Sequence, residues 1–99
     1  MKVCLIQSGG VVGAIKSCEV NTSSLEEAEA QHLKQLVHDS GLIQSSRAVS
    51  EQARDLKQYE ITIEDEAHPI CVVFDDQNVP PSARTLLGFL MQRAKPGGL

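Results

Sequence analysis

A polar turn, Ser8-Gly9-Gly10, separates two apolar runs near the start of the chain, residues 3–7 and 11–20. Glycine supplies the positive φ that a tight turn between antiparallel strands needs. The pattern therefore predicts that the first two strands form a hairpin. Gly13 interrupts the second run, and an isolated glycine inside a strand indicates a bulge there.

Two segments have the apolar periodicity of helices. In the first, Ser23 and Glu26 have the spacing of a capping box, which predicts a helix from Leu25 to a stop at Gly41. Its expected apolar stripe is Leu25, Ala28, His32, Leu33, Leu36 and Val37. In the second, Pro80-Pro81 opens a helix, since proline is tolerated in a first turn. The stripe of this helix is Ala83, Leu86, Leu87, Leu90, Met91 and Ala94.

Two further strands lie between the helices. Tyr59, Ile61 and Ile63 alternate with polar residues, which predicts an antiparallel strand exposed on one face. Residues 69–75 are apolar at both odd-numbered and even-numbered positions, which favours a central strand covered on both faces. Residues 42–54 are polar and aperiodic and predict a long loop.

The resulting order, ββαββα, predicts a single α+β domain over residues 1–95 with a flexible tail at 96–99. We expect a four-stranded, mostly antiparallel sheet with two helices packed on it. In this topology three connections meet at one end of the domain: the Ser8-Gly9-Gly10 turn, the loop after Gly41 and the loop after Asp75. Loops clustered on a rigid scaffold are a common binding surface.

Composition excludes several classes of protein. With 9 basic and 13 acidic residues the chain has a net charge of −4 and lacks the basic stripe of a nucleic-acid binder. No apolar run approaches the ~20 residues of a membrane span. Its three cysteines, Cys4, Cys18 and Cys71, are an odd number with no CxxC pair, which favours free thiols in a reducing compartment. We expect a cytoplasmic monomer.

No pattern of catalytic or metal-binding residues stands out. The segment from Ser8 to Gly13 lacks the helix that a dinucleotide fingerprint requires. His32 and His38 are six residues apart, which does not place two imidazoles on one helix face. Cys71 lies within an apolar strand, where cysteine behaves as a small hydrophobic residue. We therefore expect no enzyme activity, no cofactor and no metal.

The polar residues of the expected loop cluster are candidates for binding a protein. The carboxylates of Asp75 and Asp76 could meet a metal or a basic group of a partner. The alternative is that at least one of them accepts N–H groups of its own loop, as aspartate at a strand end usually does. Arg54 could pair with Asp55 or contact a partner. The expected partner-binding residues are Ser8, Gly9, Gly10, Val11, Leu42, Ile43, Arg54, Asp75 and Asp76.

Short motifs along nearly the whole chain resemble the emfourin family. They are Ser8-Gly9-Gly10 after a strand, Arg54-Asp55 before the alternating strand, Phe74-Asp75-Asp76, and Val79-Pro80-Pro81 before Leu86-Leu87-x-Phe89-Leu90. The resemblance implies an α+β fold and a proteinaceous inhibitor of thermolysin-like zinc metallopeptidases such as protealysin. It implies neither catalysis nor a cofactor in the inhibitor. Many members have an aromatic residue after the double glycine, where this chain has Val11.

The resemblance leads to a hypothesis about mechanism. An apolar residue (Val11, Leu42 or Ile43) would enter the peptidase cleft, with the carboxylate of Asp75 or Asp76 placed toward it. Preorganised loops would lose little entropy on binding. The alternative function is a non-inhibitory interaction or structural module that uses the same loops.

Overall fold

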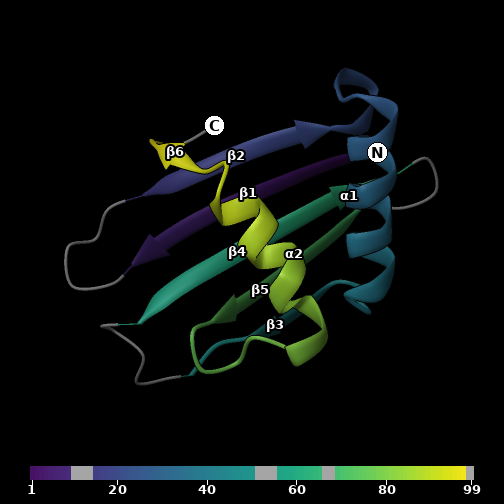
Figure 1. The fold of residues 1–99 in the computed structure, drawn as a ribbon. Helices are drawn as coiled ribbons and strands as arrows, with labels where there is room; N and C mark the ends of the chain where they lie inside the picture. Colours follow the sequence, from purple (N-terminus) through teal and green to yellow (C-terminus); the bar gives the residue numbers. More distant parts are fainter. Residues whose placement is uncertain (10–14, 51–55, 66–68, 98–99) are drawn as a thin grey trace.

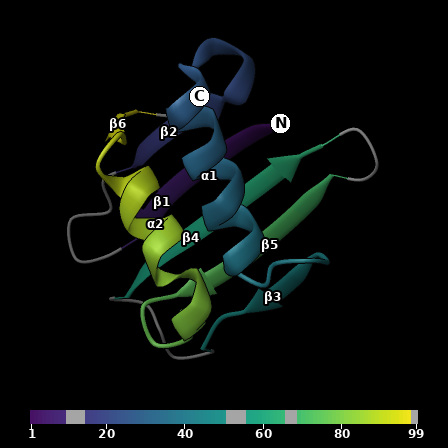
Figure 2. The ribbon, with the colours of Figure 1, turned by 45° about the vertical axis from the view of Figure 1, so that its right-hand side comes forward.

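The computed structural model describes residues 1–9, 15–50, 56–65 and 69–97 (Figure 1). Both α-helices lie on one face of a single six-stranded sheet (Figures 1 and 2). In chain order the elements are β1 (Lys2–Gly9), β2 (Lys16–Asn21), the 3-10 turn η1 (Thr22–Ser24), α1 (Glu27–Asp39), β3 (Ser46–Ala48), β4 (Lys57–Glu64), β5 (Ile70–Asp75), the 3-10 turn η2 (Pro81–Ala83), α2 (Arg84–Met91) and β6 (Lys95–Pro96).

The strand order is β3-β5-β4-β1-β2-β6. β1 pairs antiparallel with β2, which confirms the predicted hairpin, and also with β4, while β4 pairs antiparallel with β5. The expectation of four strands is wrong, because a short strand is added at each edge. β3 pairs parallel with β5, and all three of its residues are exposed, so it has no apolar alternation to predict it. The predicted bulge at Gly13 lies outside the described residues.

β6 forms the other edge of the sheet. Lys95 and Pro96 pair with Ser17 and Lys16 of β2, and the Gly97 N–H donates to the Ile15 carbonyl at 2.9 Å. The expected boundary after residue 95 falls inside this pairing. Whether residues 96–99 are flexible stays a prediction.

The hydrophobic core fills the space between the sheet and the two helices. Tyr59, Ile61 and Ile63 of β4 are buried, as their alternation predicted. The expectation that β5 is covered on both faces is wrong, because Cys71 and Val73 remain half-buried on the face that carries no helix. The largest completely buried core residues are Phe74, Leu5, Leu33, Ile61, Leu86, Leu90 and Val3.

The first helix begins two residues later than predicted. The N-cap residue of α1 is Glu26, which makes no side-chain capping hydrogen bond, so the predicted capping box of Ser23 and Glu26 is wrong. The side-chain cap in this region belongs to η1, where Asn21 accepts from the Ser23 N–H at 3.0 Å. Leu33 and Leu36 are buried, whereas Ala28 and His32 are exposed, so the buried stripe is narrower than predicted. Gly41 follows the helix with φ +71°, in agreement with the predicted stop.

The helices cross the strands steeply instead of running along them (Figure 2). In α2, Leu86, Phe89 and Leu90 are buried against the sheet and α1. No helix in the described part of the chain is both long and apolar enough to cross a membrane. All three cysteines are free thiols.

Candidate functional site

Four of the expected binding residues meet at one end of the sheet. β1 and β5 end there and β4 begins, with Gly9 opposite Lys57 and Gln58 opposite both Ser8 and Asp75. Asp76 follows directly, and its backbone N–H donates to the Lys57 carbonyl at 3.1 Å. We call the group of Ser8, Gly9, Lys57, Asp75 and Asp76 the β1–β5 end.

Gly9 fits its position because it has no side chain. Its φ is +79°, and a Cβ built there would lie 2.8 Å from the Leu56 carbonyl oxygen. Both the left-handed conformation and the close approach of the next strand therefore favour glycine. The glycine of this turn is thus explained by backbone geometry, whatever the turn binds.

Asp75 is completely buried and holds the loop that follows β5. One of its carboxylate oxygens accepts from the Ser50 N–H at 2.6 Å, and the other accepts from Gln77 N–H at 2.9 Å and Asn78 Nδ2 at 2.7 Å. The Ser50 hydrogen bond is the largest effect that lowers the pKa of Asp75, and the Asn78 and Gln77 bonds add to it against the opposing effect of burial. Of the two roles considered for this carboxylate, the structure places Asp75 in the local, loop-holding one.

Asp76 is exposed, and its carboxylate is nevertheless held in place. Oδ1 accepts from the Tyr59 hydroxyl at 2.7 Å, and Oδ2 accepts from the Lys57 N–H at 3.2 Å. A carboxylate has about four acceptor positions, so two hydrogen bonds leave capacity for a further donor or cation. This is an oriented, accessible negative charge at the β1–β5 end.

Tyr59 connects this carboxylate to the core. Its ring is buried and lies 6.0 Å from the Phe74 ring centroid. Burial is the main cause that raises the pKa of Tyr59 to about 12, and the hydrogen bond and negative charge of Asp76 add to it. The phenol thus stays protonated and remains a donor to Asp76 throughout the neutral range.

Leu42 and Ile43 do not join the β1–β5 end. They line a cavity of about 420 Å³ together with Met1 and Ile70, which are at the opposite ends of β1 and β5. The expectation of one loop cluster is wrong here, because α1 crosses the strands and delivers the chain to the start of β3, which runs parallel to β5. Ile43 is 81% exposed at this second location.

Three expected residues, Gly10, Val11 and Arg54, lie outside the described residues. Sequence reasoning did not include Ser50, Lys57 and Tyr59, although all three hydrogen-bond to the aspartates. For Tyr59 a signal existed: a tyrosine at a core position near a strand end carries a hydroxyl that needs a partner. For Ser50 and Lys57 the backbone N–H is the donor, and no side-chain pattern identifies it.

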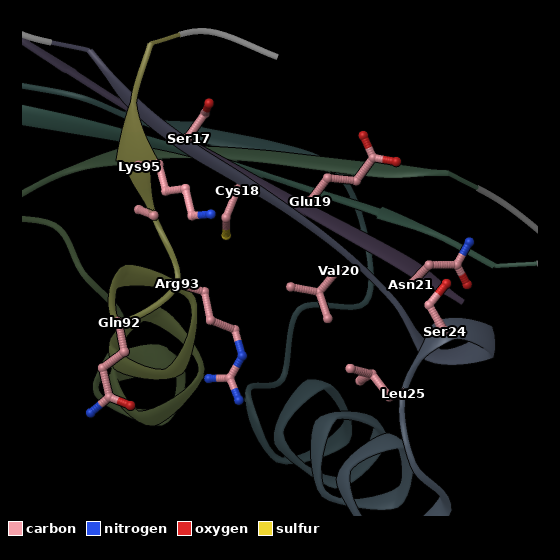
Figure 3. Close-up of a pocket in the computed structure, with 11 residues that line it drawn as sticks. Ser17, Cys18, Glu19, Val20, Asn21, Ser24, Leu25, Gln92, Arg93 and Lys95 are labelled. Carbon is pink, nitrogen blue, oxygen red and sulfur yellow. The ribbon is translucent and has the colours of Figure 1, made fainter.

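A larger groove lies between β2 and the C-terminal end of α2 (Figure 3). Its volume is about 620 Å³, which is in the range of ligand pockets, roughly 300–1,000 Å³. Arg93 lies on one side, with its guanidinium 3.7 Å above the Phe89 ring centroid and 2.8 Å from Glu29 Oε1. The lining residues are Ser17, Cys18, Glu19, Val20, Asn21, Ser24, Leu25, Gln92, Arg93, Ala94 and Lys95.

The histidines and cysteines of the described residues form no metal-binding group of three. His32 is exposed and packs its ring 5.6 Å from the Phe89 ring centroid, so it contacts the apolar stripe without being buried in it. Cys71 Sγ lies 3.7 Å from a Glu60 carboxylate oxygen, with no histidine among its hydrogen-bond partners in the described part of the chain.

Comparison with models of known protein families shows to which family the chain belongs. The family model described as Emfourin matches residues 5–91 of the 99. The chain belongs to the Emfourin family. Membership suggests the role of a metallopeptidase inhibitor in general terms, and thus a protease as partner. Searches of curated proteins and of solved structures find no match.

Proposed function

We propose that this Emfourin-family protein inhibits thermolysin-like zinc metallopeptidases by blocking their active-site cleft with the β1–β5 end. Membership of the family, which extends over residues 5–91, is the observation that carries the proposal. The geometry of the β1–β5 end supports it, because the end combines a fixed backbone with an accessible carboxylate.

Preorganisation is the physical argument for this surface. Gly9 is held in the pairing of β1 with β4, opposite Lys57, and Asp75 ties the loop after β5 to Ser50. Loops that are already ordered lose little conformational entropy on binding, so more of the contact energy appears as affinity. An inhibitor that must not be cleaved also benefits from a backbone that resists rearrangement.

Asp76 is the proposed polar contact. Its carboxylate is exposed and oriented by Tyr59 and Lys57, and it retains acceptor capacity for a cationic group of the peptidase cleft. Gly10, Val11 and Arg54 remain proposed contacts outside the described residues. Leu42 and Ile43 lie at the opposite end of the strands and are left out of this interface, whereas Ser8 and Gly9 are kept.

The test is a titration of a thermolysin-like peptidase with the protein, following cleavage of a fluorogenic peptide. We expect stoichiometric or tight inhibition by the wild type and an inhibition constant roughly tenfold or more higher for Asp76→Asn. Glu27→Gln, which removes an equal charge from the exposed first turn of α1, is the matched control. It should inhibit like the wild type.

A second variant separates contact from positioning. Tyr59→Phe keeps the Asp76 carboxylate but removes the hydroxyl that orients it. It should weaken inhibition less than Asp76→Asn does. Absence of inhibition across several thermolysin-like peptidases would instead favour a non-inhibitory interaction module.

A further inference from the structure

The outer edge of β2 is only partly covered. β6 pairs with Lys16 and Ser17, and β2 then continues to Asn21 with no further strand beside it among the described residues (Figure 1). Residues 18–21 extend over ~13 Å at the usual rise of a strand. An open edge of this kind presents backbone donors and acceptors to any extended chain.

The pairing register shows which backbone groups point outward. Pro96 has no N–H, so its pair with Lys16 must be the type without mutual hydrogen bonds. On the inner side, the Thr22 N–H donates to the Met1 carbonyl at 2.9 Å, so the backbone N–H and C=O groups of the even-numbered residues of β2 point toward β1. The backbone groups of the odd-numbered residues therefore point outward, and those of Glu19 are at the centre of the open edge.

The groove of about 620 Å³ lies directly beneath this edge. Cys18 and Val20 point from β2 into it, while the side chains of Ser17 and Glu19 are on the other side of the strand (Figure 3). Leu25 closes the apolar floor. A residue placed opposite Val20 on an added strand would point its side chain into this apolar space, because paired residues share a face.

The charged residues of the groove favour an acidic side chain on a segment that binds there. Arg93 and Lys95 line one wall, in contrast to the net charge of −4 of the chain. Glu29 already pairs with Arg93, but no carboxylate in the described part of the chain lies within ion-pair distance of Lys95. The carboxylate of Glu19 is 3.5 Å from Lys2 Nζ on the opposite face.

We propose that the open edge of β2 binds an extended peptide segment of a partner protein by strand addition at Glu19. The segment places an apolar side chain over Val20 and an acidic side chain near Lys95. Backbone hydrogen bonds give affinity in this mode of recognition, and the pockets for alternate side chains give specificity. The site lies along the side of the sheet, is separate from the β1–β5 end, and does not depend on the peptidase.

A second copy of the chain fits this edge less well. β6 of each copy already occupies part of β2, so at most residues 18–21 of each could pair. Antiparallel pairing centred on Glu19 would place two Glu19 side chains opposite each other, which is unfavourable. The remaining ~13 Å of edge is also short for a stable dimer, which buries roughly 800 Å² per partner.

The test compares Glu19→Pro with Glu19→Ala. Both lose the contact with Lys2, but only proline removes the outward N–H, and an edge strand tolerates proline at such a position. A random peptide phage library is selected on the wild-type protein. The recovered peptides should bind Glu19→Ala like the wild type and Glu19→Pro about tenfold or more weakly.

Two further measurements keep the proposal falsifiable if Glu19→Pro fails to fold. Bound peptide should slow amide hydrogen exchange of Glu19 in the wild type, and Lys95→Glu should weaken binding more than Lys95→Gln. No recovered peptides, peptides that bind both Glu19 variants equally, or unchanged exchange at Glu19 would overturn the proposal. Concentration-dependent dimers of Glu19→Ala that are absent in Glu19→Pro would overturn it in favour of a second copy.

Discussion

The Tyr59 hydroxyl donates a hydrogen bond of 2.7 Å to Asp76 Oδ1, and so joins a buried ring of β4 to an exposed carboxylate beyond the end of β5. The same carboxylate accepts from the Lys57 N–H through its other oxygen. Two donors with fixed positions restrict the rotamers of Asp76. The orientation of the proposed contact group is therefore determined by two donors of β4, one of which is the hydroxyl of a buried ring.

The first prediction concerns the ionisation of Tyr59, which is the only tyrosine in a chain without tryptophan. Its pKa should be about 12 in a spectrophotometric titration of the phenolate. In Asp76→Asn the pKa should fall part of the way toward the ordinary value of 10.0, because the negative charge is lost while burial, the main cause of the shift, remains and the amide oxygen can still accept. An unchanged pKa in this variant would contradict a contribution of the Asp76 charge.

The same shift makes stability depend on pH. Since the pKa of Tyr59 in the folded state lies above the unfolded value of 10.0, the contribution of Tyr59 to the free energy of unfolding is complete below about pH 10. This contribution is lost as the pH rises toward about 12. Tyr59→Phe removes this dependence and lowers the free energy of unfolding at neutral pH by about 1 kcal/mol, the usual net value of one hydrogen bond. Urea denaturation at several pH values measures both effects.

The second prediction compares two glycines. Gly9→Ala should lower the free energy of unfolding by roughly 1–3 kcal/mol, because alanine is strained at φ +79° and its Cβ meets the Leu56 carbonyl oxygen. Gly88→Ala is the control, since a Cβ at this exposed helical position meets nothing within 4 Å. It should raise the free energy of unfolding by roughly 0.5–1 kcal/mol. Equal effects of the two substitutions in urea denaturation would contradict the positive φ and the close approach at Gly9.

The sequence predicted those elements that have an internal period. Tyr59, Ile61 and Ile63 alternate strictly, and the structure buries all three. Leu33 and Leu36 likewise identify the buried side of α1. In each case the apolar side chains face a single core, so local pattern and tertiary contact agree.

The remaining features depend on contacts between distant residues. β3 has three exposed residues and β6 has two, one of them a proline, so neither carries a strand pattern. Both exist because a neighbouring strand offers them unpaired backbone groups. The direction of α1 across the sheet, which separates Leu42 and Ile43 from the β1–β5 end, is also a property of packing and is not encoded in the helix itself.

The third prediction concerns Asp75. Its pKa is below the ordinary value of 3.8, so its contribution to stability is present above about pH 4 and is lost as the pH falls through the folded pKa. Asp75→Asn should destabilise the protein at neutral pH. Its amide has only one oxygen, and the NH2 group cannot accept a hydrogen bond, so the donors Ser50, Gln77 and Asn78 cannot all keep their acceptor. Acid denaturation of this variant should show a weaker pH dependence than that of the wild type. If the variant and the wild type lose stability over the same acid pH range and by the same amount, Asp75 does not cause this pH dependence.

The last prediction concerns Arg93, which connects the two helices. Its guanidinium stacks on Phe89 of α2 and bonds Glu29 of α1, so Arg93→Ala should lower the free energy of unfolding by roughly 0.5–2 kcal/mol. A double-mutant cycle with Glu29→Gln isolates the ion pair. Because both side chains are partly exposed, the coupling should be at most about 1 kcal/mol and should decrease with added salt. A coupling that is insensitive to salt would show that Glu29 contributes through packing. The position of Arg93 in the wall of the groove beside β2 would then depend only on its contact with Phe89.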